Sequence, residues 1–555
     1  MKRDNLFNAL TVAIVVVFAI LALYRLNNAY FWSDEAYVAF MASNFLKTGH
    51  LSCWDGRNLY VTMSGSLLHP GFTQPAQFSL DIMAAALSFK LFGISTWSAR
   101  LPSVIFGVAG LIAFNALLRM EFPKRRALTL FALALLAFSV QYLLNARTAR
   151  YYTEVSFFSI GAYYCYRRFC ADRSWKAALG LSVWAILLFY GHLLGGLAFI
   201  LALAVTHLLF HLKAFTKPDW TKIGVAALIF LVATLPFVVA NHLWAYGRTP
   251  QAPSAMPTRL WLIWLNLRDL NLTNCFPWTC AIGLIFLMRY RRNDEGVAPV
   301  ATRIVEWGAI ILCYAIFQGM LCAPSQVSWS VAIVRYFSPI LPFLTGLCGV
   351  FVWMVYRISK PTSIGLFLLV ICTNLTTLTP LSPRIAPATD NPDSLLPAYV
   401  VEITHPYETA DAAVSRFLRN NAHRDDVVTP YPNSHATTMD FYDGDFIRTG
   451  ALLDDRCALP KETVNKLHAP LRRDDTYPDW IVFYGPEIDQ PSTLKYFCRP
   501  HLVDGKMISF HYPLAARLNV FGDESNRSEL IYHSFKPLKV TDPKEAVYIY
   551  RLQKH

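Results

Sequence analysis

Apolar runs long enough to cross a membrane follow one another through most of this chain, and short basic connections separate them. A helix needs about 20 apolar residues to cross the hydrocarbon core of a bilayer, where it satisfies its own backbone hydrogen bonds. The composition agrees with this pattern, because 54% of the residues are hydrophobic and only 16% are charged. Such a chain is too apolar for an ordinary soluble protein. We therefore predict a polytopic, all-α membrane protein.

The distribution of basic residues predicts how the chain is oriented. Cytoplasmic connections are enriched in Lys and Arg, and Lys2 and Arg3 precede the first apolar run, from Ala9 to Leu23. The N-terminus is therefore expected in the cytoplasm. No small-residue cleavage site follows that run, so we expect a retained anchor rather than a signal peptide. The formal net charge of +13 has the same origin, and nucleic acid is not expected as a partner.

Every second connection after the first span is basic, which gives a self-consistent topology of about eleven spans and an extracytoplasmic C-terminal part. The spans are predicted at residues 9–23, 101–118, 128–144, 155–166, 177–190, 193–209, 223–240, 276–288, 304–321, 337–356 and 364–379.

Two parts of the chain differ in composition. Residues 1–380 hold the spans and a long outer loop at residues 27–100, in which residues 35–46 and 77–92 are predicted to form interfacial helices. Residues 381–555 begin with a proline-rich linker and are polar enough to form a small soluble α/β domain outside the membrane.

Periodic patterns support the α/β prediction for the C-terminal domain. Thr409 to Asn420 has its apolar residues on one side, as in an amphipathic helix. Cys457 and Cys498 both lie in this domain, and the sequence leaves open whether they pair in an oxidising compartment. Short strands are predicted at Val427–Thr429, Trp480–Tyr484 and Ala546–Tyr550.

An acidic pair, Asp34 and Glu35, follows the first apolar run in the stretch Tyr30-Phe-Trp-Ser-Asp-Glu-Ala-Tyr37. One charge at mid-bilayer costs roughly 2.5–3.5 kcal/mol, so the pair is expected at the aqueous boundary or in a polar cavity. The residues alone leave two interpretations open. The carboxylates cap the helix that follows, since carboxylates favour helix N-termini, or they take part in catalysis.

An ordered set of motifs resembles the bacterial protein O-mannosyltransferase and aminoarabinose transferase family, of the glycosyltransferase C superfamily. The resemblance extends from about Tyr30 to Pro342 and is weak in the C-terminal domain. The motifs are Ser33-Asp-Glu-Ala-Tyr37, Leu87-Ser-Phe-Lys-Leu-Phe-Gly93 with Ser98-Ala-Arg-Leu-Pro102, Ala146-Arg-Thr-Ala-Arg150, and Arg335-Tyr-Phe-Ser-Pro-Ile-Leu-Pro342.

The resemblance implies transfer of a sugar from a polyprenyl-phosphate carrier to an acceptor, with inversion at the anomeric carbon and without a nucleotide sugar. The implied acceptor is a protein, lipid A or a cell-envelope glycan on the outer face of the plasma (inner) membrane. Donor and membrane lipid are the implied partners. Such a reaction requires a base for the acceptor hydroxyl and cations for the phosphate leaving group.

The resemblance also assigns roles to charged residues. Asp34 matches the family's catalytic aspartate and is expected to take the acceptor proton, while Glu35 orients it or binds a neighbouring group. Arg147, Arg150 and Arg335 are expected to bind the donor phosphate, because guanidinium groups match phosphate oxygens and these arginines lie at outer span ends, against the positive-inside bias. The alternative is that they anchor lipid headgroups.

Four further residues complete the predicted site. Tyr37 and Tyr336 match family positions near the donor, although tyrosine also populates the membrane interface. His192 lines the cavity or is a structural histidine. Many relatives carry a lysine before the second interfacial helix that this chain lacks, and a protonated His69 would substitute for it.

Other functions are less consistent with the sequence. No histidine or carboxylate set has the ligand spacing of a motif such as HExxH, so no metal site is predicted, and the need for a divalent cation stays open. A transporter or flippase of lipid-linked sugars would place charges near the midplane and repeat its spans, and we see neither. A scaffold would leave the set from Asp34 to Arg335 unexplained. We therefore predict a glycosyltransferase.

Overall fold

The computed structural model describes most of the chain. The described residues are 2–60, 68, 71–73, 79–241, 256–273, 277–290, 298–322, 334–372, 395–404, 408–432, 435–450, 459, 477–484, 494–495, 498, 501–503, 506–520 and 545–553.

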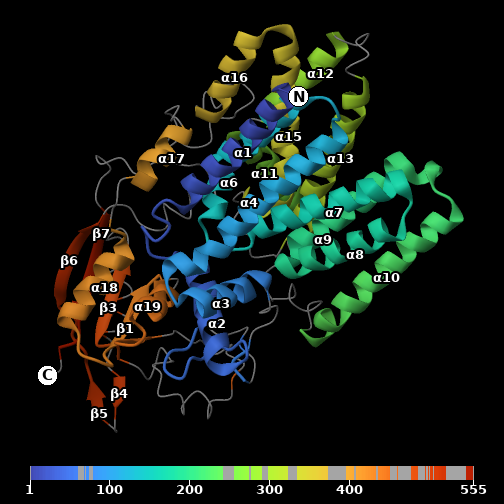
Figure 1. The fold of residues 1–555 in the computed structure, drawn as a ribbon. Helices are drawn as coiled ribbons and strands as arrows, with labels where there is room; N and C mark the ends of the chain where they lie inside the picture. Colours follow the sequence, from blue (N-terminus) through green and yellow to red (C-terminus); the bar gives the residue numbers. More distant parts are fainter. Residues whose placement is uncertain are drawn as a thin grey trace.

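Helices form wherever apolar spans are predicted, and they pack side by side into one bundle (Figure 1). They are α1 (Lys2–Leu23), α4 (Thr96–Glu121), α5 (Arg126–Phe138), α6 (Val140–Ala146), α7 (Tyr152–Asp172), α8 (Trp175–Gly191), α9 (Leu193–His211), α10 (Lys217–Ala240), α12 (Pro277–Tyr290), α13 (Ala298–Leu321), α15 (Leu341–Ile358) and α16 (Lys360–Cys372). The two helices predicted in the outer loop are α2 (Ser33–Thr48) and α3 (Leu80–Phe92), and α11 covers Met256–Thr273.

Within the described residues, fewer helices qualify as complete spans than the eleven predicted. Six described helices are long and apolar enough to cross a membrane, and α5 with α6 makes a seventh if this pair, bent by 57°, is one broken span. Helices α8, α12 and α16 have only 17, 14 and 13 residues. At about 1.5 Å per residue they fall short of a hydrocarbon core about 30 Å thick. The count of about eleven spans is therefore not confirmed.

The outer helices of the bundle present apolar side chains outward. Leu228, Leu231, Val232 and Leu235 on α10 are all more than half exposed. Such a face is unfavourable in water but not against lipid, because the hydrophobic effect acts only where water is displaced. This pattern agrees with a multi-pass membrane protein.

Buried ion pairs join the helices at one end of the bundle. Arg167 on α7 lies 2.7 Å from Glu121 at the end of α4 and 3.6 Å from Glu306 on α13. Arg303 lies 2.8 Å and 2.5 Å from the same two glutamates. The glutamate side chains are 3% and 2% exposed. Because each carboxylate is shared between two guanidinium groups, the ends of α4, α7 and α13 are held in a fixed relation.

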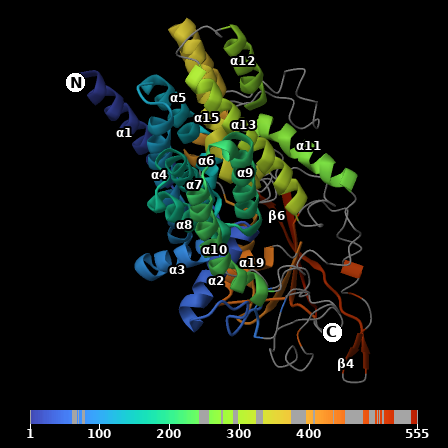
Figure 2. The ribbon, with the colours of Figure 1, turned by 90° about the vertical axis from the view of Figure 1, so that its right-hand side faces the viewer.

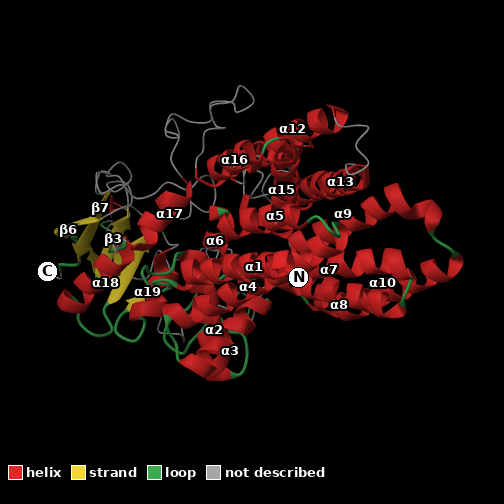
Figure 3. Ribbon diagram, turned by 45° about the horizontal axis from the view of Figure 1, so that its top comes forward, coloured by secondary structure: helices red, strands yellow, loops and turns green. Residues whose placement is uncertain are grey.

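The C-terminal elements form a five-stranded mixed sheet beside the bundle, with α18 and α19 next to it (Figure 3). The strand order is β2-β1-β3-β7-β6; β1 runs parallel to β2 and β3, and β7 runs antiparallel to β3 and β6. The elements are α17 (Leu395–Thr404), α18 (Ala410–Asn421), β1 (Val427–Tyr431), α19 (Ala436–Asp443), β2 (Arg448–Thr449), β3 (Trp480–Tyr484), β4 (His501–Val503), β5 (Lys506–Ile508), β6 (Leu514–Val520) and β7 (Glu545–Arg551).

The helix and three strands predicted in this region are confirmed as α18, β1, β3 and β7. Val414 and Leu418 of α18 pack on Val428 and Val482 of the sheet, which explains the one-sided apolar pattern of that helix. The predicted boundary near residue 380 lies outside the described residues. So does Cys457, and its pairing with the half-buried Cys498 stays a prediction.

A close contact between α15 and α5 fixes one wall of the bundle. A Cβ atom at Gly349 on α15 would lie 2.5 Å from the Cα atom of Ala132 on α5, so the two backbones meet through small residues. Helix α15 continues directly from the short 3₁₀ helix η3 (Val334–Ile340), which carries Arg335. The contact therefore holds the helix that follows Arg335 against α5.

Gly349→Ala is expected to destabilise the protein by about 1–3 kcal/mol, because the methyl group overpacks the contact with Ala132. The apparent unfolding temperature in detergent measures this loss. Gly365→Ala on α16 is the control, since no atom lies within 4 Å of its Cβ position. Equal unfolding temperatures for the two variants would contradict the backbone contact.

Candidate functional site

Asp34 lies in the first turn of α2, where it meets two arginines from distant parts of the chain. Its Oδ2 atom accepts hydrogen bonds from Arg150 Nη2 at 3.2 Å and from Arg335 Nη1 at 3.1 Å. Arg150 comes from the loop between α6 and α7, and Arg335 from η3. The Asp34 side chain stays 32% exposed. The structure thus brings together three of the predicted site residues and leaves the carboxylate accessible.

The two cations determine the charge of Asp34. Desolvation raises the pKa of its carboxyl group, but the charges and hydrogen bonds of Arg150 and Arg335 outweigh it and hold this pKa below its ordinary value of 3.8. Burial also disfavours the Arg150 cation, but Asp34 leads the charges that raise the Arg150 pKa well above its usual range. Asp34 is therefore a carboxylate at neutral pH, ready to accept a hydrogen bond or a proton.

Glu35, the other half of the acidic pair, is buried and fully engaged. Arg100 on α4 donates to both of its oxygens, each at 2.8 Å, and the backbone N–H of Ala149 donates to Oε1 at 2.8 Å. The side chains of Glu35 and Arg100 are 3% and 5% exposed. This bidentate pair joins the start of α2 to α4 and to the loop that carries Arg150. Its contacts are those of a residue that positions the site rather than one that meets substrate.

Two serines of α7 hold η3 in place, and a third serine stabilises η3 from within. Ser156 Oγ donates to the carbonyl of Ser338 at 2.6 Å, and Ser159 Oγ donates to the carbonyl of Pro339 at 2.7 Å. Ser338 Oγ in turn donates to the carbonyl of Arg335 at 2.7 Å. Carbonyl groups near a proline lack regular helical partners, because proline has no N–H and interrupts the pattern. The hydroxyl groups therefore fix the short helix that presents Arg335.

His192 lies in the turn between α8 and α9, within a stack of aromatic rings. Its ring lies 4.3 Å from that of Tyr151 and 5.2 Å from that of Tyr336. Burial, with the charges of Arg150 and Arg335, lowers the His192 pKa to about 3, so the imidazole is neutral.

The imidazole has a defined proton arrangement. Its Nδ1 atom accepts from the backbone N–H of Gly195 at 3.0 Å, which caps α9. A neutral imidazole that accepts at Nδ1 carries its proton on Nε2. His192 therefore combines a structural contact with a hydrogen-bond donor beside the two arginines.

Aromatic side chains lie near Asp34 and near its partner Arg335. The ring of Tyr37 on α2 lies 4.9 Å from that of Tyr60. Burial raises the pKa of Tyr60 well above its ordinary value, and the charges of Tyr37 and Asp34 add to the shift. On the other side, the Arg335 guanidinium lies 5.2 Å from the Tyr336 ring and 5.3 Å from the Trp32 ring, within cation–π range.

Arg147, one of the predicted phosphate ligands, contacts backbone carbonyl groups near the end of α1. Arg147 donates to the carbonyls of Ala22 at 2.9 Å, Tyr24 at 2.6 Å and Arg25 at 3.0 Å. It therefore caps the C-terminal end of α1, where helix carbonyls lack intrahelical partners. Phosphate binding or headgroup anchoring by Arg147 stays a prediction. His69 lies outside the described residues.

Helix α19 of the C-terminal region supports the segment that leads into α2. The backbone N–H of Phe31 donates to Tyr442 Oη at 3.1 Å, and Thr438 Oγ1 donates to the Phe31 carbonyl at 3.3 Å. The rings of Tyr30 and Tyr442 stack with centroids 3.7 Å apart. The position of Asp34, three residues after Phe31, therefore depends on the C-terminal region as well as on the bundle.

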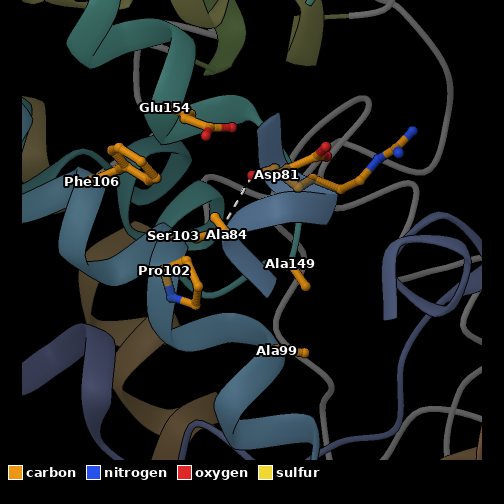
Figure 4. A pocket seen from close by; sticks show the side chains of 9 residues that line it. Asp81, Ala84, Ala99, Pro102, Ser103, Phe106, Ala149 and Glu154 are labelled. Atoms are coloured by element: carbon orange, nitrogen blue, oxygen red, sulfur yellow. Dashed lines mark hydrogen bonds between the residues drawn. The ribbon is translucent and has the colours of Figure 1, made fainter. Parts of the chain in front are cut away.

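A small cavity between α3, α4 and α7 adjoins Arg150 (Figure 4). Asp81 and Glu154 line it, and among the described groups neither Asp81 Oδ2 nor Glu154 Oε2 has a hydrogen-bond partner. Burial raises the pKa of Asp81 although Arg150 opposes the shift. The cavity volume of about 10 Å³ is close to the space that one water molecule needs. The cavity is thus too small for a sugar or a phosphate group.

The ion pairs around Asp34 consist of a carboxylate and arginines, and arginine is not a metal ligand. In the part of the chain that the structure describes, no group of three or more His, Cys, Asp or Glu side chains is arranged to hold a metal ion.

Sequence reasoning missed Arg100, which fixes Glu35. The sequence did contain a signal for this role. Arg100 is a cation at the outer end of a predicted span, inside the motif Ser98-Ala-Arg-Leu-Pro102, and such a cation requires a buried partner. The supporting serines and Tyr442 carry no comparable signal, since nothing local connects them with Asp34.

Two solved structures share the fold of this chain. The crystal structure of ArnT from Cupriavidus metallidurans in the apo state matches with a TM-score of 0.52 and 14% identity, over 91% of this chain and 97% of that chain. The crystal structure of ArnT from the same organism bound to undecaprenyl phosphate matches with a TM-score of 0.51 and 14% identity, over 98% and 97%. No protein-family model and no curated protein matches the chain. At the level of the fold, the chain is therefore similar to these two ArnT structures.

Glu35→Gln is expected to destabilise the protein by about 3–5 kcal/mol, because it leaves the buried Arg100 cation without its counter-charge. Thermal unfolding in detergent measures the loss. Asp34→Asn is the matched comparison and should cost less, since the Asp34 carboxylate is partly exposed. If the two variants unfold at the same temperature, the positioning role of Glu35 is wrong.

Proposed function

We propose that this chain is a membrane glycosyltransferase that moves a sugar from a polyprenyl-phosphate carrier to an acceptor, with inversion at the anomeric carbon. The observation that carries the proposal is the accessible Asp34 carboxylate within 3.2 Å of Arg150 and Arg335. A base beside two cations is what transfer from a phosphate-linked donor requires. The ArnT structure with the same fold contains undecaprenyl phosphate, which supports a carrier of that class.

In the proposed reaction the acceptor hydroxyl donates a hydrogen bond to Asp34. Its oxygen attacks the anomeric carbon from the face opposite the phosphate, and its proton passes to the Asp34 carboxylate. The bond between the anomeric carbon and the phosphate oxygen breaks, and its electron pair leaves with the polyprenyl phosphate. Because the pKa of Asp34 lies below 3.8, the proton moves late, after the new bond has made the acceptor oxygen acidic.

The two arginines stabilise the departing phosphate. A guanidinium group has five N–H donors in a planar fork, and Arg150 and Arg335 each use one nitrogen on Asp34. Guanidinium groups suit phosphate oxygens, whose charge grows as the bond to the sugar breaks. We propose that Tyr37, Tyr336 and the Nε2–H of His192 contact the donor. We propose that Glu35 acts through its neighbours by holding α2 against the Arg150 loop.

We place this site on the extracytoplasmic face of the plasma (inner) membrane. Lys2, Arg3 and Lys124–Arg126 occupy the opposite ends of α1, α4 and α5, and such clusters mark the cytoplasmic side. The C-terminal sheet then lies outside the membrane, beside α2. An acceptor that approaches from that side is a protein, lipid A or another envelope glycan.

Asp34→Asn is expected to lower the transfer rate about 10²-fold or more, because the amide cannot take the acceptor proton. The assay follows labelled sugar from synthetic polyprenyl-phosphate donors into a membrane extract, and the labelled product names the acceptor class. Asp172→Asn, at the other end of α7 and 39% exposed, is the control and should keep full activity. An Asp34→Asn protein that transfers at the parent rate would refute the base assignment. Lipid-linked sugar that crosses vesicles without transfer would favour a flippase.

Arg335→Gln and Arg150→Gln are each expected to lower kcat/KM for the donor by about 10²–10³, as when one donor to a developing anion is removed. Arg147→Gln should lower the unfolding temperature, because the end of α1 loses its cap, while kcat/KM per folded molecule stays within about threefold. An Arg147→Gln protein with normal stability and a large loss of kcat/KM would return Arg147 to the donor site.

A further inference from the structure

A second cavity lies at the end of the bundle away from Asp34. Figures 1 and 2 place the start of α1 there, far from the sheet. The cavity is bounded by α1, α4 and α5 and by the connection from α4 to α5, and its volume is about 240 Å³. This is near the lower limit of about 300 Å³ for pockets that bind small molecules. Four basic residues line it: Arg119, Lys124, Arg125 and Arg126.

Contacts with neighbouring helices arrange these cations around the cavity. Arg119 Nη2 on α4 donates to Asn8 Oδ1 on α1 at 2.9 Å. The Arg126 guanidinium lies 5.7 Å from the Phe7 ring, and the Arg125 guanidinium lies 5.4 Å from the Trp353 ring. Cation–π contacts of this kind restrict the motion of a side chain. The basic groups therefore form a built surface rather than a set of freely moving side chains.

The wall behind the cavity is rigid. Phe122, one of the lining residues, packs edge-on against the buried Trp307 ring at 5.5 Å. The preceding residue is Glu121, which belongs to the buried ion pairs with Arg167 and Arg303. A ligand held here would join α1 to the part of the bundle that those ion pairs fix.

The cavity also borders surface suited to lipid. Leu6 and Leu10 on α1 are 58% and 43% exposed, and only 11% of the apolar stretch of α1 is buried within the protein. Helices α1 and α4 are candidate spans, and their ends at the cavity lie at the level where headgroups meet water. A molecule with an anionic head and apolar chains would find cations and an apolar helix side by side.

We propose that this cavity binds the phosphate headgroup of an anionic phospholipid from the surrounding bilayer. Guanidinium and ammonium groups match phosphate oxygens, and basic pockets between spans are suited to anionic headgroups. The acyl chains lie along the exposed side of α1. The site shares no residue with the Asp34 site and does not depend on the proposed transfer reaction.

The test uses native mass spectrometry of the full chain in detergent, titrated with phosphatidylglycerol or with phosphatidylcholine of the same acyl chains. The cavity variant combines Arg119→Gln, Lys124→Gln and Arg125→Gln. The matched control combines Lys176→Gln, Lys213→Gln and Lys217→Gln, which remove three exposed charges outside the cavity. Lys213 lies at the same end of the bundle as the cavity, because the nearby His211 lies 3.5 Å from Glu306, which belongs to the buried ion pairs at that end.

The parent and the control are expected to bind phosphatidylglycerol at least tenfold more tightly than phosphatidylcholine, and the cavity variant is expected to lose this preference. Retained preference in the cavity variant, or equal loss in the control, would overturn the proposal. Soluble glycerol phosphate that binds as tightly as the lipid would assign the site to a free phosphate instead. Unfolding temperatures without lipid check that all three proteins fold. If the triple variant does not fold, Arg119→Gln and Lys124→Gln are titrated singly, each with an expected loss of about threefold.

Discussion

The bidentate pair between Glu35 and Arg100 is the interaction on which the geometry of the site depends. It buries two opposite charges at 2.8 Å, and the same carboxylate also accepts the backbone N–H of Ala149. A buried pair gains little net stability over an apolar pair, but it is costly to break from one side. The pair therefore fixes the positions of α2, α4 and the Arg150 loop relative to one another. The distance between Asp34 and Arg150 depends on that placement.

In the proposed mechanism, Asp34 and the donor phosphate compete for the same guanidinium groups. Before the donor binds, Arg150 and Arg335 both contact Asp34 Oδ2 and depress its basicity. A phosphate anion that draws on those cations adds like charge beside the carboxylate, and both effects raise the Asp34 pKa. The base thus becomes stronger when the leaving group is in position. In the proposed mechanism, Asp34 therefore accepts a proton more readily when the donor is bound.

Local pattern predicted much of the fold, and order along the chain predicted part of the site. The helix at each apolar run follows from the length and apolarity of the run. The amphipathic α18 and strands β1, β3 and β7 follow from periodicity, which indicates the buried face of an element. The span count is not confirmed, because an apolar run does not show whether its helix is long enough to cross a membrane, as α8 with 17 residues illustrates. Asp34, Arg150 and Arg335 were predicted as a group from ordered motifs. Arg147 lies in one of the same motifs, yet it caps α1, since a motif does not state which way a side chain points. The role of Tyr442 depends on a contact across 411 positions, which no local signal encodes.

The support that α19 gives to Phe31 has a consequence for the order in which the protein becomes competent. The strand order puts β7 between β3 and β6, so the sheet beside α19 lacks an interior strand until residue 551 has been synthesised. Spans emerge and insert earlier, from the N-terminal side, as domains generally form during translation. The carboxylate of Asp34 is made among the first residues, yet the backbone ahead of it is secured among the last. A newly inserted chain therefore passes through a period in which the bundle is assembled while the acidic turn is still loosely held.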